Sequence, residues 1–135
     1  MNAEVSFDVP GLPPTKNEAL SLFNPEHGQH DAVIRLLTAA RAAIIDPDTI
    51  PHTGPLGIEI VVTTAGGRAP ADATNYLGGI GDVLQARGKQ SHAAQYGLLG
   101  GVALFADDGQ LREVRYRERA GSPTSYSVRI WNLTP

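Results

Sequence analysis

The sequence predicts a small α/β (α+β) fold, with two main helices packed on a mixed sheet of about four strands in the order β-α-β-α-β-β. Three observations lead to this prediction. Strand-like and helical segments alternate along most of the chain, two strand-like segments close it, and no linker or repeat divides its 135 residues. A hydrophobic content of 41% and a charged content of 19% are those of a globular protein. We therefore expect residues 1–135 to form one domain.

One strand and one helix are expected in the first part of the chain. Residues 4–9, EVSFDV, alternate apolar and polar side chains, which is typical of a half-buried strand. The segment 10–17, PGLPPTKN, is predicted to be a rigid loop because its prolines exclude a helix. Residues 31–45 have apolar side chains at helical spacing, and Pro47 provides the stop signal.

The second part of the chain is expected to contain three strands and one helix. Residues 57–64, GIEIVVTT, are rich in β-branched side chains and predict a strand. A helix should begin at Asp72, and its apolar stripe consists of Leu77, Ile80 and Leu84. Residues 111–119 and 125–133 read as two strands, which the loop 120–124 would join as an antiparallel hairpin.

Three glycines interrupt the second predicted helix: Gly78, Gly79 and Gly81. Each costs ~1 kcal/mol relative to alanine in a helix interior, so something must compensate. They match neither a phosphate-binding loop nor a dinucleotide fingerprint. We therefore expect a packing role, in which the glycines let another stretch of backbone approach the helix closely.

Composition excludes several classes of function. The chain has no cysteine, so disulfides, thiolate nucleophiles and cysteine-ligated metals are absent. The N-terminal residues lack the basic and apolar regions of a signal peptide, and no apolar run reaches the ~18 residues of a transmembrane helix. These features lead us to expect a cytoplasmic protein without a membrane partner.

The net charge of −3 is divided unevenly along the chain. Residues 1–108 contain six Lys or Arg and twelve Asp or Glu, whereas residues 109–135 contain five Arg and two Glu. The two parts therefore carry formal charges of −6 and +3. Such a chain can combine a basic face with an acidic cluster, as metal-dependent nucleases do and as many proteins without that role also do.

Carboxylates at two places are candidates for a metal site. Asp72 begins the second helix, and Asp107 and Asp108 precede the strand at 111–119. Mg²⁺ needs oxygen ligands, usually one or two carboxylates completed by phosphate and water. The alternatives are structural, because Asp72 suits a helix N-cap and residues 107–109 suit an ordinary turn.

A row of arginines is the candidate basic surface. Arg115, Arg117 and Arg119 share one face of a predicted strand, because side chains alternate along strands. Their spacing of ~7 Å is similar to the phosphate repeat of a nucleic-acid strand. The alternative is a solvated strand face, with Glu113 and Glu118 nearby.

Taken in order, these motifs resemble the RusA-type Holliday-junction resolvases. The loop motif P-P-S/T-x-N of that family is matched by Pro13, Pro14, Thr15 and Asn17. The motif D-x-D-N is matched at Asp72 and Asn75, and the motif D-D-x-Q/K is matched by Asp107, Asp108 and Gln110. Asp82 corresponds to a further acidic position in the same helix. The resemblance covers most of the chain in the right order.

Two departures from the family pattern affect its active centre. The second aspartate of D-x-D-N is Thr74 here, and the family's lysine one turn further along falls on Gly78. A hydroxyl cannot supply the charge of a carboxylate to Mg²⁺, and glycine offers nothing to a phosphate. The resemblance therefore implies a site that has kept its shape and lost about half its chemistry.

The resemblance implies a divergent Mg²⁺-dependent endonuclease, with Mn²⁺ as a substitute, that acts as a homodimer on branched DNA in recombination and repair with weakened activity. Asp72 and Asp108 would be catalytic, and Asp72, Asp107 and Asp108 would hold the metal. The DNA contacts it implies are Lys16, Asn17, Arg68, Asn75, Arg115, Arg117 and Arg119. The alternatives are a degenerate relative that binds DNA or a protein without cleavage, and an unrelated protein-interaction module.

Overall fold

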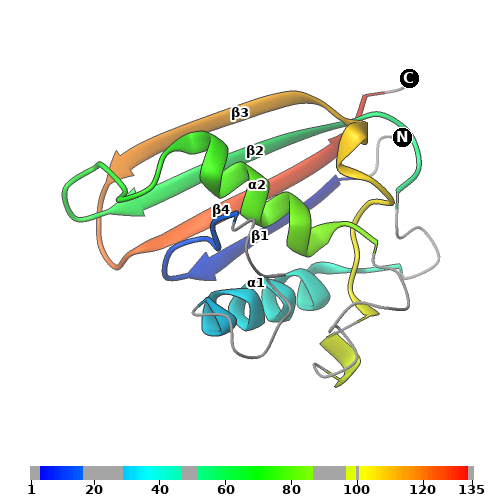
Figure 1. Cartoon of the computed structure of the whole chain (residues 1–135), viewed down its shortest axis with the longest axis horizontal. Coiled ribbons are helices and arrows are strands. Elements are labelled where there is room, and N and C mark those ends of the chain that lie inside the picture. Colours follow the sequence, from blue (N-terminus) through cyan, green and yellow to red (C-terminus); the bar gives the residue numbers. More distant parts are fainter. Residues whose placement is uncertain (1–3, 17–28, 47–51, 87–96, 100, 134–135) are drawn as a thin grey trace.

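The computed structural model describes residues 4–16, 29–46, 52–86, 97–99 and 101–133. Four strands and two main helices follow one another in the predicted order, with the short 3₁₀ helix η3 between α2 and β3 (Figure 1). The elements are β1 (Glu4–Pro10), α1 (His30–Ala43), β2 (Leu56–Thr64), α2 (Ala73–Leu84), η3 (Asp108–Gln110), β3 (Leu111–Ala120) and β4 (Ser125–Asn132). The predicted mixed α/β fold is thus confirmed.

The sheet has the spatial order β1-β4-β2-β3. β2 pairs with β3 in parallel and with β4 in antiparallel fashion. The predicted hairpin of the last two strands is therefore wrong, because β2 lies between them. The residues of β2 are buried at nearly every position, which favours the centre of a sheet. Those of β3 alternate between half-buried and exposed, which suits the edge.

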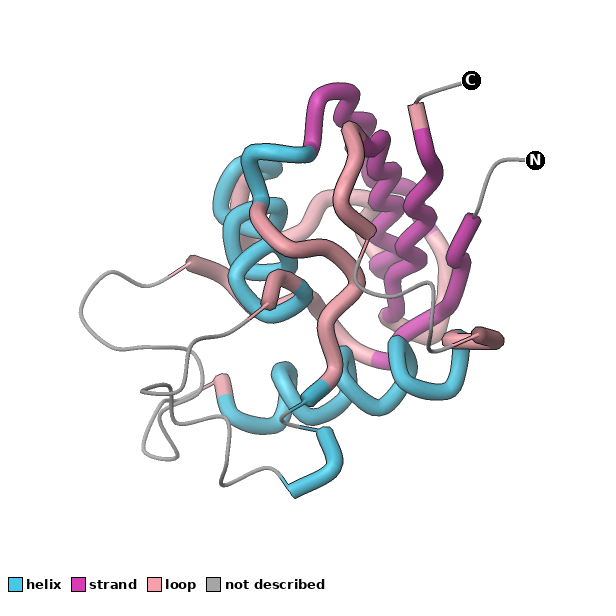
Figure 2. The backbone as a smooth tube through the Cα atoms, turned by 90° about the vertical axis from the view of Figure 1, so that its right-hand side faces the viewer, coloured by secondary structure: helices cyan, strands magenta, loops and turns pink. Residues whose placement is uncertain are grey.

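Both helices lie on the same face of the sheet, and the core fills the space between the two layers (Figure 2). α1 directs its buried residues toward the sheet at positions i, i+3, i+4 and i+7, the spacing of one helix face: Val33, Leu36, Leu37 and Ala40. α2 contributes Tyr76, Ile80, Val83 and Leu84. No described helix covers the opposite face of the sheet (Figure 2). That face carries polar side chains of the alternating strands β1 and β3.

The glycines of α2 allow the loop after β1 to cross the helix. A β-carbon at Gly79 would overlap the backbone carbonyl of Pro14, and one at Gly78 would lie 3.1 Å from Cδ of Lys16. The Lys16 N–H donates to the carbonyl of Asn75 at 3.1 Å, which holds the loop in place. The predicted close approach of another backbone is therefore confirmed at Gly79, whereas at Gly78 the close neighbour is the side chain of Lys16. At Gly81 a β-carbon would make only an ordinary contact, 3.9 Å from Cβ of Asp108.

Candidate functional site

Asp72 caps the N-terminus of α2. Its Oδ1 accepts hydrogen bonds from the Asn75 N–H and from the Thr74 hydroxyl, both at 2.9 Å. These two donors hold the pKa of the Asp72 carboxyl below its ordinary value, with the Asn75 N–H as the larger cause. The structural alternative for this residue, an N-cap, is thus confirmed, and one carboxylate oxygen is committed to the start of the helix.

Asp108 lies at the other end of the same helix. Its Cβ is next to Gly81, and its N–H donates to Oε1 of Gln85 at 3.1 Å. Nine residues of helix separate Asp72 from Gly81, which at ~1.5 Å per residue amounts to ~14 Å. The expectation that Asp72 and Asp108 share one cation is therefore wrong.

A network of hydrogen bonds brings Asp108 to this position. The Leu104 N–H donates to the Leu84 carbonyl at 2.8 Å, and the His52 N–H donates to the Leu104 carbonyl at 2.9 Å. The side-chain amide of Gln110 then donates to the His52 carbonyl at 2.9 Å. The segment that carries Asp108 is thereby attached to the C-terminal end of α2, and Gln110 of the D-D-x-Q motif acts as the anchor.

Asp107 also has a structural role. Its Oδ1 accepts from the Gly109 N–H at 3.2 Å, and it forms a capping box with Gln110 at the start of η3. A capped 3₁₀ helix thus stands where the sequence indicated a turn. Within the described ranges, no group of three or more His, Asp or Glu residues lies close enough together to hold a metal ion. The predicted triad of Asp72, Asp107 and Asp108 is not assembled.

Asp82, which the sequence did not single out as a metal ligand, lies next to Asp108. Burial raises the pKa of the Asp82 carboxyl; the negative charge of Asp108 raises it further, and the positive charge of Lys16 opposes the shift. Among the described residues, no donor hydrogen-bonds to either carboxylate. The resemblance marked Asp82 as a further acidic position, but its pairing with Asp108 could not be inferred without knowing that this distant segment folds back onto α2.

Lys16 completes this group of charges. Its Cβ and Cδ lie 3.2 and 3.1 Å from the β-carbon position of Gly78, so its aliphatic stem lies along the helix where a side chain would otherwise stand. Asp82 follows Gly78 by one turn on the same face of α2. We call Lys16, Asp82 and Asp108 the α2 cluster.

The α2 cluster meets the minimum requirement for a hard divalent cation. Two carboxylates that accept no hydrogen bond from a described residue lie near one another, and their mutual repulsion is the kind that a bound cation relieves. Mg²⁺ is commonly held by one or two carboxylates, with water and phosphate filling its other positions. The donor set therefore fits Mg²⁺ or Mn²⁺, although it lacks a third carboxylate within the part of the chain described.

A hollow lies beside Asp72, between the N-terminus of α2 and β3. It has a volume of about 350 Å³, and Arg68 and Tyr116 are among its lining residues. The Tyr116 hydroxyl donates to Oε2 of Glu118 at 2.9 Å, and the Ala69 N–H donates to the same oxygen at 3.0 Å. Burial, followed by the contact with Glu118, raises the pKa of Tyr116. These contacts engage Glu118 in holding the loop before α2.

The predicted arginine row lies on the face of the sheet that no described helix covers, which we call the open face. Its three arginines make different contacts. Arg115 pairs with Glu113 at 3.1 Å and lies over the ring of Trp131, 5.9 Å from its centroid. Arg119 donates to the hydroxyl of Thr63 at 2.9 Å. Arg117 has no hydrogen bond or ion pair with another described residue. Two of the three side chains therefore also serve the sheet itself.

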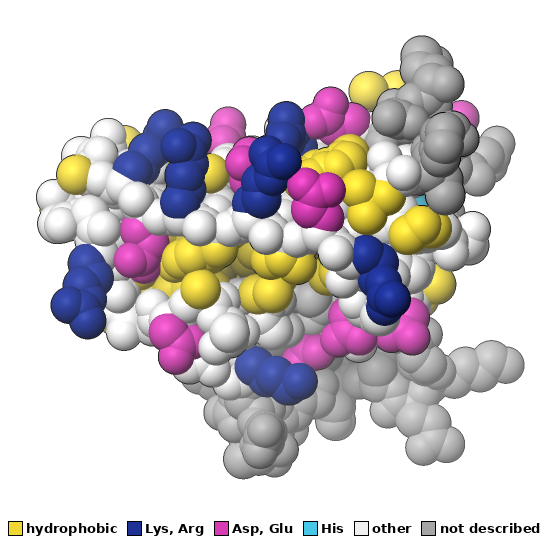
Figure 3. All heavy atoms as spheres, turned by 90° about the horizontal axis from the view of Figure 1, so that it is seen from above, with side chains coloured by type: hydrophobic (Ala, Val, Ile, Leu, Met, Phe, Trp, Pro, Cys, Tyr) yellow, Lys and Arg dark blue, Asp and Glu magenta, His cyan; other side chains and the backbone are white. Residues whose placement is uncertain are grey.

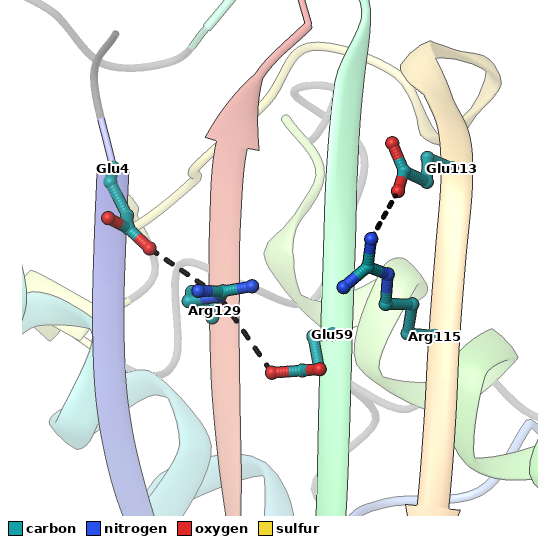
Figure 4. A network of polar contacts seen from close by, with 5 residues as sticks. All are labelled: Glu4, Glu59, Glu113, Arg115 and Arg129. Carbon is teal, nitrogen blue, oxygen red and sulfur yellow. Dashed lines mark hydrogen bonds and ion pairs between the residues drawn. The ribbon is translucent and has the colours of Figure 1, made fainter.

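Acidic residues occupy one end of this open face. Arg129 of β4 lies between Glu4 of β1 and Glu59 of β2, with N–O distances of 3.5 and 3.8 Å (Figure 4). Arg115 and Glu113 continue the network on β3 (Figure 4). The surface is thus of mixed charge here and basic only toward Arg117 and Arg119.

The predicted DNA-contacting residues fall on two sides of β3. Lys16, Arg68 and Asn75 are exposed on or near α2, whereas the arginine row lies on the open face. Asn17 lies outside the described residues. Figure 3 shows Lys and Arg side chains in dark blue on both sides of an apolar band along this part of the molecule.

Comparison with known proteins adds no identification. No protein-family model matches the chain, and no curated protein sequence matches it significantly. Within the described residues, no helix has the length and apolar character needed to cross a membrane.

Proposed function

We propose that the protein is a divergent RusA-like endonuclease that acts on branched DNA such as Holliday junctions, depends on Mg²⁺ or Mn²⁺, and turns over slowly. The observation that carries this proposal is the α2 cluster. Two carboxylates from distant parts of the chain lie near one another with no hydrogen-bond donor among the described residues, and a third segment contributes a lysine. A metal ion and a phosphate are the ligands that such a combination suits.

Each member of the α2 cluster has a distinct role in the proposal. Asp82 and Asp108 hold the divalent cation, which when bound would polarise the scissile phosphate and activate water. Lys16 is exposed, and its ammonium group contacts a phosphate of the DNA strand. Arg68 and Asn75 extend the DNA-contacting surface toward the N-terminus of α2.

Slow turnover follows from the small number of charges. Two carboxylates offset less of the dehydration free energy of Mg²⁺ than three would. Thr74 cannot add charge, and its hydroxyl is already hydrogen-bonded to Asp72. We therefore expect weak metal binding and a correspondingly low rate.

The direct test is cleavage of a synthetic four-way junction in Mg²⁺ or Mn²⁺. Asp82→Asn and Asp108→Asn should each abolish the slow cleavage by the unmodified protein. Asp72→Asn is the matched control, because asparagine is as good an N-cap as aspartate and leaves α2 intact. Cleavage that is lost in Asp72→Asn and kept in Asp82→Asn would refute the assignment to the α2 cluster.

A second candidate function is binding of branched DNA without cleavage. It is favoured by the engagement of Asp72 in the N-cap and by the absence of a three-carboxylate group from the described residues. Under this alternative, the protein retards junction DNA equally well in EDTA and in Mg²⁺, and prolonged incubation with Mn²⁺ yields no cut strand. Such a result would exclude the endonuclease and keep the DNA-binding surface.

A further inference from the structure

The outer edge of β3 is open within the described part of the fold. β3 pairs only with β2 among the described strands, so one row of its backbone N–H and C=O groups has no partner in the sheet. The strand has ten residues and contains neither proline nor glycine. A long, regular edge of this kind is a template for pairing with another strand.

An exposed apolar side chain lies near the middle of this edge. Val114 is 44% exposed and is the one large hydrophobic residue of the described strands that is exposed. Leu111 and Tyr116 of the same strand are partly buried against the core. A solvent-exposed valine at the centre of an unpaired strand edge is the feature that a partner strand would cover.

The glycines of α2 leave no room for close approach of a second copy of the chain at Gly78 or Gly79. The space at Gly79 is already filled by the Pro14 carbonyl of the same chain, and the space at Gly78 by Lys16. If two copies of the chain associate, another surface must bring them together.

The charges on β3 select one register for pairing with a second copy. In an antiparallel pair related by a two-fold axis perpendicular to the sheet, opposed residues lie on the same face. An axis at Val114 places Glu113 of each copy opposite Arg115 of the other copy, which gives two pairs of opposite charge. An axis at Glu113 or Arg115 opposes that residue to its own copy, and for Arg115 this offsets part of the gain from the Glu113–Arg117 pairs that would also form. An axis at Tyr116 forms Glu113–Arg119 pairs but opposes Arg115 to the partner's Arg117 twice, and like charges directly opposed are destabilising.

We propose that two copies of this chain pair through β3, antiparallel, with the two-fold axis at Val114. The two sheets then form one continuous sheet, and the exposed valines meet at its centre. Arg115 and Glu113, already paired within one chain (Figure 4), become part of a four-residue charge network across the axis. Because such an axis preserves the faces of the sheet, both α2 helices lie on the same side of the dimer.

The proposal is independent of DNA binding and is tested by charge reversal. Sedimentation of the unmodified protein over about a hundredfold range of concentration should show a reversible monomer–dimer equilibrium. Glu113→Arg and Arg115→Glu each oppose like charges across the axis, and each should give a monomer at every concentration. The double change Glu113→Arg with Arg115→Glu restores opposite charges and should restore the dimer.

The control reverses a charge at the other edge of the sheet. Glu4→Arg on β1 breaks a comparable exposed ion pair, with Arg129, and should leave the dimer intact. Circular dichroism verifies that each single variant is folded. A monomeric unmodified protein, or single variants that dimerise as well as it does, would overturn the proposal. Failure of the double change to restore the dimer would overturn the register.

Discussion

The two ends of α2 each carry aspartate, and the protein treats them differently. At the N-terminal end, the Asp72 carboxylate accepts two hydrogen bonds from residues of its own helix turn. At the C-terminal end, Asp82 and Asp108 have no described donor and repel one another. The fold engages one oxygen of the first carboxylate, whereas the second pair accepts no hydrogen bond from a described residue and is the cation site that we propose.

This difference shows that a residue that matches a sequence motif is not always free to bind a ligand. Asp72 matches the motif D-x-D-N, yet its carboxylate caps the N-terminus of α2. Asp82 was noted only as a further acidic position of the family's helix, but the fold places a second carboxylate and a lysine near it. The four predictions that follow test this contrast, and the largest expected effect comes first.

Gly79→Ala should destabilise the protein severely, because its β-carbon would overlap the Pro14 carbonyl, which is rigid backbone. We expect a loss of about 3 kcal/mol in the free energy of unfolding, the upper range for overpacking. Gly81→Ala is the matched control in the same helix. Its β-carbon meets only an ordinary contact, so we expect a gain approaching ~1 kcal/mol from helix propensity. Urea denaturation measures both, and equal effects would contradict the loop crossing.

Mg²⁺ should raise the melting temperature of the unmodified protein, since a cation that binds only the folded state stabilises it. Asp82→Asn should remove this Mg²⁺-dependent shift, and Asp72→Asn should keep most of it. Differential scanning calorimetry with and without Mg²⁺ provides the measurement. Ca²⁺ serves as a second hard cation, and the same ranking of variants is expected. A shift that survives Asp82→Asn would place the cation elsewhere.

The two ends of α2 should respond to pH with opposite sign. The pKa of Asp72 is lowered by its donors, so its stabilising effect is present above about pH 3.9 and is lost as pH falls through the lowered pKa. The pKa of Asp82 is raised, chiefly by burial. Its favourable contribution is complete below about pH 3.9 and is lost as pH rises through the raised pKa.

Free energies of unfolding measured across this pH range, for Asp72→Asn and Asp82→Asn, separate the two contributions. The loss of stability on acidification should be smaller in Asp72→Asn than in the unmodified protein. In Asp82→Asn, the decline of stability on going from pH 4 toward neutrality should be smaller, a window that begins at about the ordinary pKa of aspartate. Identical profiles for the two variants would contradict the contrast.

The smallest expected effect concerns Lys16 and DNA. Lys16→Met keeps a flexible apolar stem over Gly78 and removes only the charge, so the loop crossing should survive. Loss of one phosphate contact should reduce the slope of log affinity against log salt by about 1 and weaken binding to all sequences alike. Arg41→Met, on α1, is the control and should leave the slope unchanged. Fluorescence anisotropy at several salt concentrations measures both.

Much of the fold could be predicted because its elements carry local patterns. The alternation in EVSFDV, the helical spacing after Asp31 and the capping character of Asp72 each depend on a few neighbouring residues. The role of Gly79 was also predictable, because a glycine in a helix interior needs a compensating close contact. The resemblance to RusA-type resolvases stays a prediction.

The remaining features depend on contacts between distant segments. The position of β2 between β3 and β4 was missed, because two adjacent strand patterns joined by a short loop favour a hairpin. The pairing of Asp82 with Asp108 was missed for a similar reason. It depends on hydrogen bonds from Leu104 to Leu84 and from Gln110 to His52, which no local pattern encodes.

The crossing of the Pro14 loop over Gly79 also has a consequence for the order in which the molecule opens. A helix with three glycines should fray early by its own propensity, and its amide hydrogens should exchange quickly with solvent. Here the loop lies across the middle of α2 and is tied to it through the Lys16 N–H and the Asn75 carbonyl. The central amides of α2 should therefore exchange only when the loop lifts from the helix, later than those at either end of α1. The weakest helix by composition becomes one of the most slowly exchanging.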